Sequence, residues 1–261
     1  MEFVLIAAVA FLASGLTLYS GFGLGTLLLP AFALFLPPPA AVAATAVVHL
    51  LNNVFKAALV GRQAHWGTVV RFGLPAVPAA ILGGWLLGRL GTAPAFSWAF
   101  AGREFSPTAA GVVVGLLMIL FAVLELQPWF QRLSAPSRLL PVGGLASGFF
   151  GGLTGQQGAL RSMFLLKTGL DPARFIATGV VLAVLVDLAR LPVYAAALSR
   201  GALVLTGREA GLLAVGTGAA FLGAWLGARY IRKTSLQGLR LIVAVLMIGI
   251  GAALAVGVIG A

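Results

Sequence analysis

The sequence predicts an all-α polytopic integral membrane protein built from two homologous halves, and three observations support this prediction. Hydrophobic residues make up 61% of the 261 residues and charged residues only 9%, whereas a soluble domain has roughly a quarter charged residues. Apolar stretches of about 20 residues, the length that crosses a bilayer, recur along the whole chain. The third observation is an internal repeat.

Glycine, proline and charged residues divide the chain into apolar segments. We expect all of them to be helical, because isolated strands in lipid would leave backbone groups unpaired. The N-terminus lacks the basic region of a signal peptide, so the first segment is expected to be a membrane segment. The expected segments are 3–20, 24–36, 40–60, 67–90, 108–126, 139–153, 157–169, 173–198, 208–230 and 237–260.

A self-comparison reveals the repeat. The Leu-Ala-Ser-Gly sequence at 12–15 recurs 133 residues later at 145–148. At the same offset, Gly25 aligns with Gly158, Pro39 with Pro172, and Thr45 with Thr178. The chain therefore divides into a first transmembrane repeat at 1–126, a cytoplasmic linker at 127–138 and a second transmembrane repeat at 139–261.

Glycine-rich breaks interrupt an apolar run in each half, at 21–25 and 151–158. The pieces that follow are too short to span, so each broken segment either crosses once or turns back as a hairpin. Fourteen Lys and Arg residues are taken to lie outside the membrane. With hairpins, ten of them fall on one side of the membrane and four on the other; with single crossings, six fall on one side and eight on the other. The positive-inside rule favours hairpins. Three crossings and one hairpin per half then predict inverted repeats, with both termini outside the cytoplasm.

The two breaks are candidate parts of a substrate site. A single membrane glycine most often permits close helix packing. Two glycine-dense breaks at equivalent positions are instead typical of discontinuous helices, whose free N–H groups bind anions. The candidate substrate-binding residues of the breaks are Gly21, Gly23, Gly25, Thr154, Gln156, Gln157, Gly158 and, one turn later, Arg161.

Charged side chains within the segments are a second signal, because a charge inside a bilayer needs a partner or a water-filled cavity. Lys56 and Arg190 could each face an anion, but Lys56 could also extend to the interface and Arg190 could pair with Asp187. His49, Asn52 and Asn53 precede Lys56 on one helical face. His49 could take up a proton near neutral pH or only bond a neighbouring helix.

Charge and cysteine content exclude other functions. The net charge of +11 is spread between apolar runs, which argues against a nucleic-acid partner. The absence of cysteine excludes thiolate metal sites, and the two histidines argue against a histidine-built one. No cofactor or metal is expected.

These features resemble the sulfite exporter TauE/SafE family, also called the toluenesulfonate uptake permease family. The resemblance rests on the two glycine-rich breaks and on a proline followed six residues later by threonine in each half, Pro39 to Thr45 and Pro172 to Thr178. The chain departs from the expected pattern at Phe22 and Leu24 and at Gln156-Gln157. The resemblance implies a secondary transporter of small sulfur-containing or organic anions, such as sulfite, sulfonates or sulfoacetate.

We therefore expect a multi-pass transporter in the cell membrane that binds a small anion at the midplane and works by alternating access, coupled to protons through His49 and Asp187. The expected substrate contacts outside the breaks are Thr45, His49, Asn52, Asn53, Lys56, Thr178 and Arg190. A passive anion channel is the alternative. An intramembrane enzyme ranks lower, because the six acidic residues are dispersed. The sequence leaves open the substrate, the direction of transport, the coupling ion and the oligomeric state.

Overall fold

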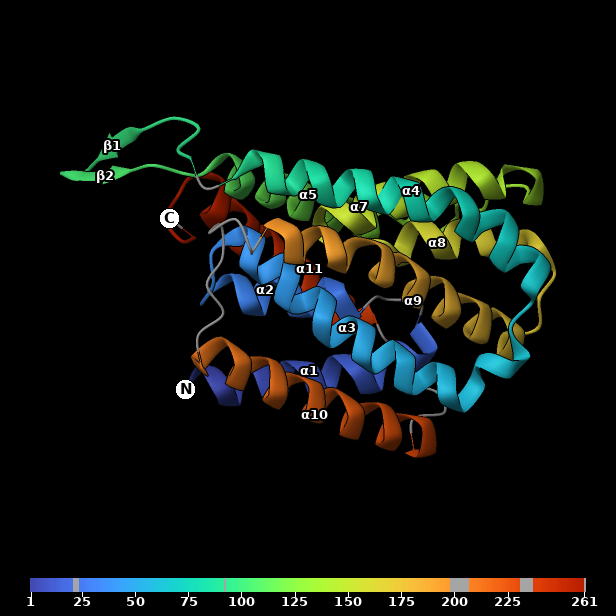
Figure 1. Ribbon diagram of the computed structural model, residues 1–261. Coiled ribbons are helices and arrows are strands. Elements are labelled where there is room, and N and C mark those ends of the chain that lie inside the picture. Colours follow the sequence, from blue (N-terminus) through green and yellow to red (C-terminus); the bar gives the residue numbers. More distant parts are fainter. Residues whose placement is uncertain (21–23, 92, 198–206, 231–236, 261) are drawn as a thin grey trace.

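The computed structural model is a bundle of helices with a two-stranded hairpin projecting from one end (Figure 1). It describes residues 1–20, 24–91, 93–197, 207–230 and 237–260. The α-helices are α1 (Glu2–Ser20), α2 (Leu24–Ala33), α3 (Pro38–Val60), α4 (Trp66–Leu90), α5 (Ala109–Leu126), α6 (Pro128–Arg132), α7 (Leu140–Thr154), α8 (Gly158–Leu165), α9 (Pro172–Ala197), α10 (Gly207–Tyr230) and α11 (Gln237–Ala255). Short 3-10 helices are η1 (Gly61–Gln63), η2 (Ser137–Leu139) and η3 (Leu166–Thr168), and the strands are β1 (Trp98–Phe100) and β2 (Arg103–Phe105).

The predicted fold class is confirmed. Among the described residues, five helices are long and apolar enough to cross a membrane: α3 extended by η1, α4, α5, α9 and α10. The helix boundaries follow local chemistry. Helices α3 and α9 begin at Pro38 and Pro172, where the missing proline N–H would have had no partner in the first turn. Helix α11 ends at Ala255, short of the predicted 260, just before Gly257, whose φ is +79°.

The second glycine-rich break is a hairpin turn. Gly155 caps α7 with φ +82°, a left-handed conformation that glycine adopts without steric cost. Helix α8 then runs back along α7, so that Gly143 near the start of α7 packs against the ring of Phe164 near the end of α8. Ser137 Oγ also donates to the carbonyl of Lys167 at 2.9 Å, joining the entrance and exit of the hairpin.

The first break is only partly described, because residues 21–23 lie outside the described residues. Helix α2 leads into α3 at the end of the bundle where a Cβ on Gly111 would lie 3.5 Å from Pro38 Cγ and one on Gly260 would lie 3.2 Å from Pro38 Cδ. The N-terminal and C-terminal ends lie at this same end of the bundle (Figure 1). Helices α1 and α2 thus also double back.

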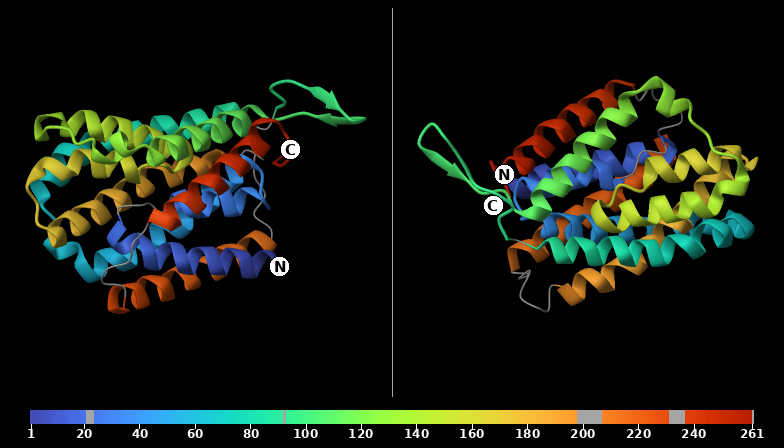
Figure 2. Two further views of the ribbon diagram at one scale, coloured as in Figure 1. Left: turned by 180° about the vertical axis from the view of Figure 1, so that it is seen from behind. Right: turned by 90° about the horizontal axis from the view of Figure 1, so that it is seen from above.

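Helices from the two predicted halves interleave. Helix α1 packs along α10, α4 along α7, α5 along α11, and α3 against α9 (Figure 2). Each pair joins a helix of the first half to one of the second. In the repeat, α1 corresponds to α7 and α10 corresponds to α4. The α1–α10 pair of helices therefore has the α7–α4 pair as its counterpart, a pattern compatible with an inverted repeat. The repeat boundaries and the inverted relationship stay predictions.

The β-hairpin was not predicted. Strands β1 and β2 pair antiparallel, with Trp98 opposite Phe105. Ala101 and Gly102 form the turn with φ values of 50° and 77°, and positive φ at both central residues is typical of the tight hairpin turn that matches strand twist. Trp98 stacks on Phe105 and donates its indole N–H to the carbonyl of Val256 at 2.8 Å. The hairpin lies between α4 and α5, outside the predicted apolar segments.

Candidate functional site

A buried ion cluster lies where α3 contacts α9. His49 Nδ1 lies 2.5 Å from Asp187 Oδ2. One turn later on α9, Arg190 donates to the other carboxylate oxygen from Nε at 3.0 Å and from Nη2 at 2.7 Å. Asp187 and Arg190 are fully buried, and such a pair needs this complete hydrogen bonding to offset its desolvation. The Asp187–Arg190 pair, which the sequence offered as the alternative to substrate contact by Arg190, is present, and His49 joins it.

Arg190 also holds the end of α7. Its Nη1 donates to the carbonyl of Gly151 at 2.8 Å. The hydroxyl of Tyr194 donates to the next carbonyl, that of Gly152, and the guanidinium lies 5.8 Å from the Tyr194 ring centroid. A cation at the C-terminus of a helix is favourable, because the last carbonyls lack helical partners. Sequence reasoning missed Tyr194, although its position four residues after Arg190 places both on one helical face.

Gln157 connects the second break to the ion cluster. Its side-chain nitrogen donates to Asp187 Oδ1 at 3.4 Å, and its side-chain oxygen accepts from Arg161 Nη1 at 3.1 Å. Its backbone carbonyl accepts from Ser147 Oγ at 3.0 Å. Ser147 was noted only as part of the repeat. Gln157 therefore links Arg161 to Asp187.

The two breaks meet beside this cluster. A Cβ placed on Gly25, at the start of α2, would lie 3.1 Å from the carbonyl oxygen of Gly155. It would also lie 3.7 Å from Thr45 Cγ2 and 3.9 Å from His49 Cδ2. The first residues of α2, the turn after α7 and the polar face of α3 thus converge at one place.

Two polar side chains at this place have no partner. Within the described part of the chain, Thr45 Oγ1 and both amide atoms of Gln156 are buried without a hydrogen bond. Gln156 is 4% exposed and Thr45 is fully buried. Leaving such a group unsatisfied costs roughly 1–3 kcal/mol, and native structures contain few of them. Orphaned donors beside a helix start are what a site without its ligand would leave.

Lys56 belongs to a separate polar group. With the Asn52 amide turned so that all its neighbours are satisfied, its nitrogen donates to Ser14 Oγ at 2.9 Å and to the carbonyl of Ala220 at 3.3 Å, and its oxygen accepts from Lys56 Nζ at 3.1 Å. Lys56 Nζ also lies 3.5 Å from the carbonyl of Ser14. Lys56 is only 5% exposed, so it does not extend into water. Among the described residues, it forms no ion pair with an acidic side chain.

The remaining candidates lie in different surroundings. Thr178 Oγ1 accepts from the backbone N–H of His65 at 2.9 Å, so it braces the connection between α3 and α4. Thr154 donates to the carbonyl of Phe150 and Asn53 to that of His49, both within their own helices. Gly158 is buried at the start of α8. Gly21 and Gly23 lie outside the described residues.

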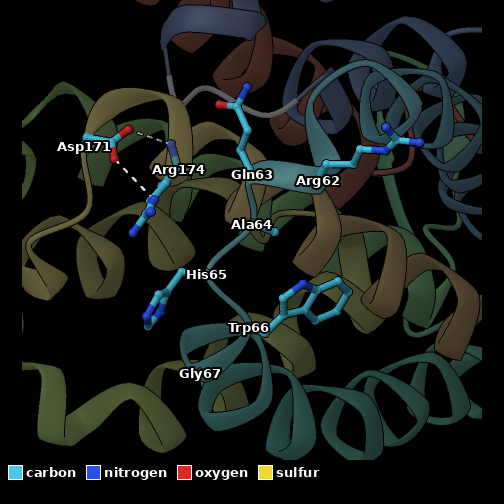
Figure 3. A pocket seen from close by; sticks show the side chains of 8 residues that line it. All are labelled: Arg62, Gln63, Ala64, His65, Trp66, Gly67, Asp171 and Arg174. Carbon is cyan, nitrogen blue, oxygen red and sulfur yellow. Dashed lines mark hydrogen bonds and ion pairs between the residues drawn. The ribbon is translucent and has the colours of Figure 1, made fainter.

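A cleft of about 630 Å³ lies at the end of the bundle where α3 passes into α4. Its lining includes Arg62, His65, Asp171 and Arg174. Figure 3 shows that these side chains point in different directions. Arg174 is paired with Asp171 at 3.5 Å, and both are more than half exposed. The cleft is a solvent-exposed recess without converging ligand groups. Among the described residues, no three His, Asp or Glu side chains gather closely enough to hold a metal ion.

Comparison with known proteins places the chain in a family. The family profile described as sulfite exporter TauE/SafE matches residues 6–254. A search of curated proteins gave no significant match. The profile covers nearly the whole chain, including both glycine-rich breaks and the buried ion cluster. The chain is a multi-pass membrane protein that belongs to the sulfite exporter TauE/SafE family, a family of membrane transporters.

Proposed function

We propose that the chain is a secondary transporter that moves a small sulfur-containing or organic anion, such as sulfite, a sulfonate or a sulfoacetate-like compound, by alternating access. The observation that carries this proposal is the pair of unpartnered side chains, Thr45 and Gln156, buried where the two breaks meet. A hydroxyl and an amide can each donate to an oxyanion oxygen. The start of α8 adds backbone N–H groups that have no helical partner.

The charge of the interior also suits an anion. Lys56, Arg161 and Arg190 lie within or beside the membrane helices, and among the described residues the one carboxylate buried near them is Asp187. With His49 neutral, these four groups carry a net charge of about +2. Positive charge in a low-dielectric interior is costly, and a bound anion would offset it. Of these three cations in the described part of the chain, Arg190 is the one that forms an ion pair with Asp187.

We propose further that His49 and Asp187 couple transport to protons. Histidine is the side chain whose charge changes most readily between about pH 5 and 8. A proton on His49 would add positive charge next to the anion site. Anion and proton would then bind with positive cooperativity, and thermodynamic linkage requires that each raises the affinity for the other.

Radiolabelled sulfite in proteoliposomes provides the test. We expect purified wild-type protein to accumulate sulfite against its gradient when an inward proton gradient is imposed. Gln156→Leu should lower accumulation, because it removes an amide that forms no hydrogen bond with any other described residue and is therefore free to bind the substrate. A passive channel would only equilibrate sulfite. If sulfite, sulfonates and sulfoacetate all fail to cross, the proposed substrate class is wrong.

A further inference from the structure

Two neighbouring glutamines in the second break differ in their hydrogen bonding. Both ends of the Gln157 amide are engaged, because its nitrogen donates to Asp187 and its oxygen accepts from Arg161. Gln156 is 4% exposed, and neither its amide nitrogen nor its amide oxygen has a partner among the described residues. Exchanging the two ends of the Gln156 amide does not change this result, since both atoms are unpaired. Gln156 therefore offers one unused donor group and one unused acceptor.

The unused acceptor distinguishes Gln156 from the other groups proposed to bind the anion beside it. The first backbone N–H groups of α8 can only donate. The hydroxyl of Thr45, which is also buried without a partner, can turn to donate or to accept. The amide oxygen of Gln156 can only accept. A ligand that consists only of oxyanion oxygens would therefore satisfy the donors of the site and leave this oxygen unpaired.

An unpaired buried acceptor makes a binding site selective. A buried polar atom without a hydrogen bond is unfavourable, and the effect is largest where water cannot replace the missing partner. A ligand that carries a donor as well as an anionic group removes this penalty, whereas an analogue without the donor keeps it. Sites built to bond a substrate hydroxyl reject analogues that lack it for the same reason. The chemistry of Gln156 thus favours one kind of anion over another.

We propose that the site where the two breaks meet selects small anions that also carry a hydrogen-bond donor, and that the amide oxygen of Gln156 is the group that selects them. Hydrogensulfite and hydroxy-substituted sulfonates belong to this class. This inference rests on the proposed anion-transport function and narrows its substrate class. Sulfite meets the requirement in its protonated form and not as the dianion. Sulfoacetate is disfavoured, because its carboxylate and sulfonate groups offer only acceptors.

A matched pair of probes isolates the donor. 2-Hydroxyethanesulfonate and propane-1-sulfonate have the same charge and nearly the same size, and they differ by a hydroxyl group in place of a methyl group. Without an acceptor in the site, the hydroxyl would weaken binding, because it would lose its bonds to water and gain none. Tighter binding of 2-hydroxyethanesulfonate therefore requires an acceptor that is available to the ligand.

Isothermal titration calorimetry of the purified wild-type protein in detergent measures the dissociation constants of both probes. We expect 2-hydroxyethanesulfonate to bind about tenfold or more tightly than propane-1-sulfonate, since one unpaired buried group has an effect of that order. Equal affinities, or tighter binding of propane-1-sulfonate, would overturn the inference and leave the anion-transport function standing. If neither probe binds, the inference also fails, and sulfite accumulation in proteoliposomes decides separately whether the proposed function holds.

Gln156→Leu tests whether this residue is the source of the preference. The variant should lose the preference for 2-hydroxyethanesulfonate, because leucine has no acceptor. Its thermal stability without ligand should equal or exceed that of the wild type, since the substitution removes an amide that has no described partner. The matched control is Gln63→Leu, which changes an exposed glutamine in η1 and should keep the wild-type preference. A preference that persists in Gln156→Leu would overturn the role of Gln156.

Discussion

Thr45 and Thr178 occupy equivalent positions in the predicted repeat but have opposite surroundings. The hydroxyl of Thr45 has no described partner, whereas that of Thr178 accepts from the backbone N–H of His65. Removing an unpaired buried hydroxyl loses no hydrogen bond, and removing a paired one orphans its donor. The same substitution at the two positions therefore separates ligand binding from folding.

We predict that Thr45→Val leaves the thermal stability of the ligand-free protein unchanged or slightly higher, but weakens stabilisation by sulfite. Thr178→Val should lower the stability by roughly 1–3 kcal/mol, because the N–H of His65 loses its acceptor. Thermal unfolding in detergent, with and without sulfite, measures both. If Thr45→Val binds sulfite as well as the wild type, Thr45 is not a substrate ligand.

His49 gives a second prediction. Glutamine can keep a hydrogen bond to Asp187 but cannot take up a proton, so His49→Gln should abolish accumulation driven by a pH gradient. A gradient of one pH unit supports at most about tenfold accumulation per proton, or about 1.4 kcal/mol. The matched control is His65→Gln, because His65 is exposed and caps α4. Proton-driven accumulation that persists in His49→Gln would assign coupling elsewhere.

At the scale of helices, glycines differ sharply in what surrounds them. On α10, a Cβ on Gly223 would meet the carbonyl of Phe11 at 2.1 Å, whereas one on Gly218 would meet nothing within 4 Å. We predict that Gly223→Ala costs roughly 1–3 kcal/mol by overpacking. Gly218→Ala should be neutral or stabilise by up to about 1 kcal/mol. Thermal unfolding of both variants checks this, and equal melting temperatures would contradict the close α1–α10 packing.

The sequence predicted the helices well, because proline, glycine and charge act locally. Pro38 and Pro172 start helices within two residues of the predicted positions, and the break at Gly155 turns the chain back. It also offered the Asp187–Arg190 pair as one of two possibilities for Arg190, since i,i+3 spacing places both residues on one face. Two features could not be predicted in this way: the meeting of Thr45 with Gly25, and the pairing of His49 with Asp187 across 138 residues. Both depend on how the helices of different segments pack.

The repeat gives equivalent residues different surroundings. Thr45 lies beside Gly25, whereas Thr178 accepts from the backbone N–H of His65. Substrate contact at both threonines stays a prediction. The halves also differ in their charged residues: one residue later in register than the main repeat, Asp187 of the second half aligns with Asn53 of the first. A repeat fixes the backbone arrangement more strongly than it fixes the chemistry of each site.

At the scale of the whole molecule, the two ends of the bundle differ in charge. One end carries the β-hairpin, the N-terminus and the Glu2–Arg208 pair. The opposite end carries α6, the cleft and the entrance of the α7–α8 hairpin. The described basic residues of that opposite end include Arg62, Arg132, Arg138, Lys167 and Arg174. The positive-inside rule therefore predicts that the α6 end faces the cytoplasm.

Cysteine labelling in intact cells tests this orientation. Phe100→Cys lies in the β-hairpin and Arg132→Cys in α6, both at exposed positions of a chain without native cysteine. A membrane-impermeant maleimide should label Phe100→Cys in intact cells and Arg132→Cys only after permeabilisation. Both variants should react equally in detergent, which controls for accessibility. The opposite pattern would place the α6 end outside. The cleft and the Lys56 side of α3 lie toward that end. The opposite labelling pattern would therefore also reverse the side of the membrane toward which each proposed anion contact lies.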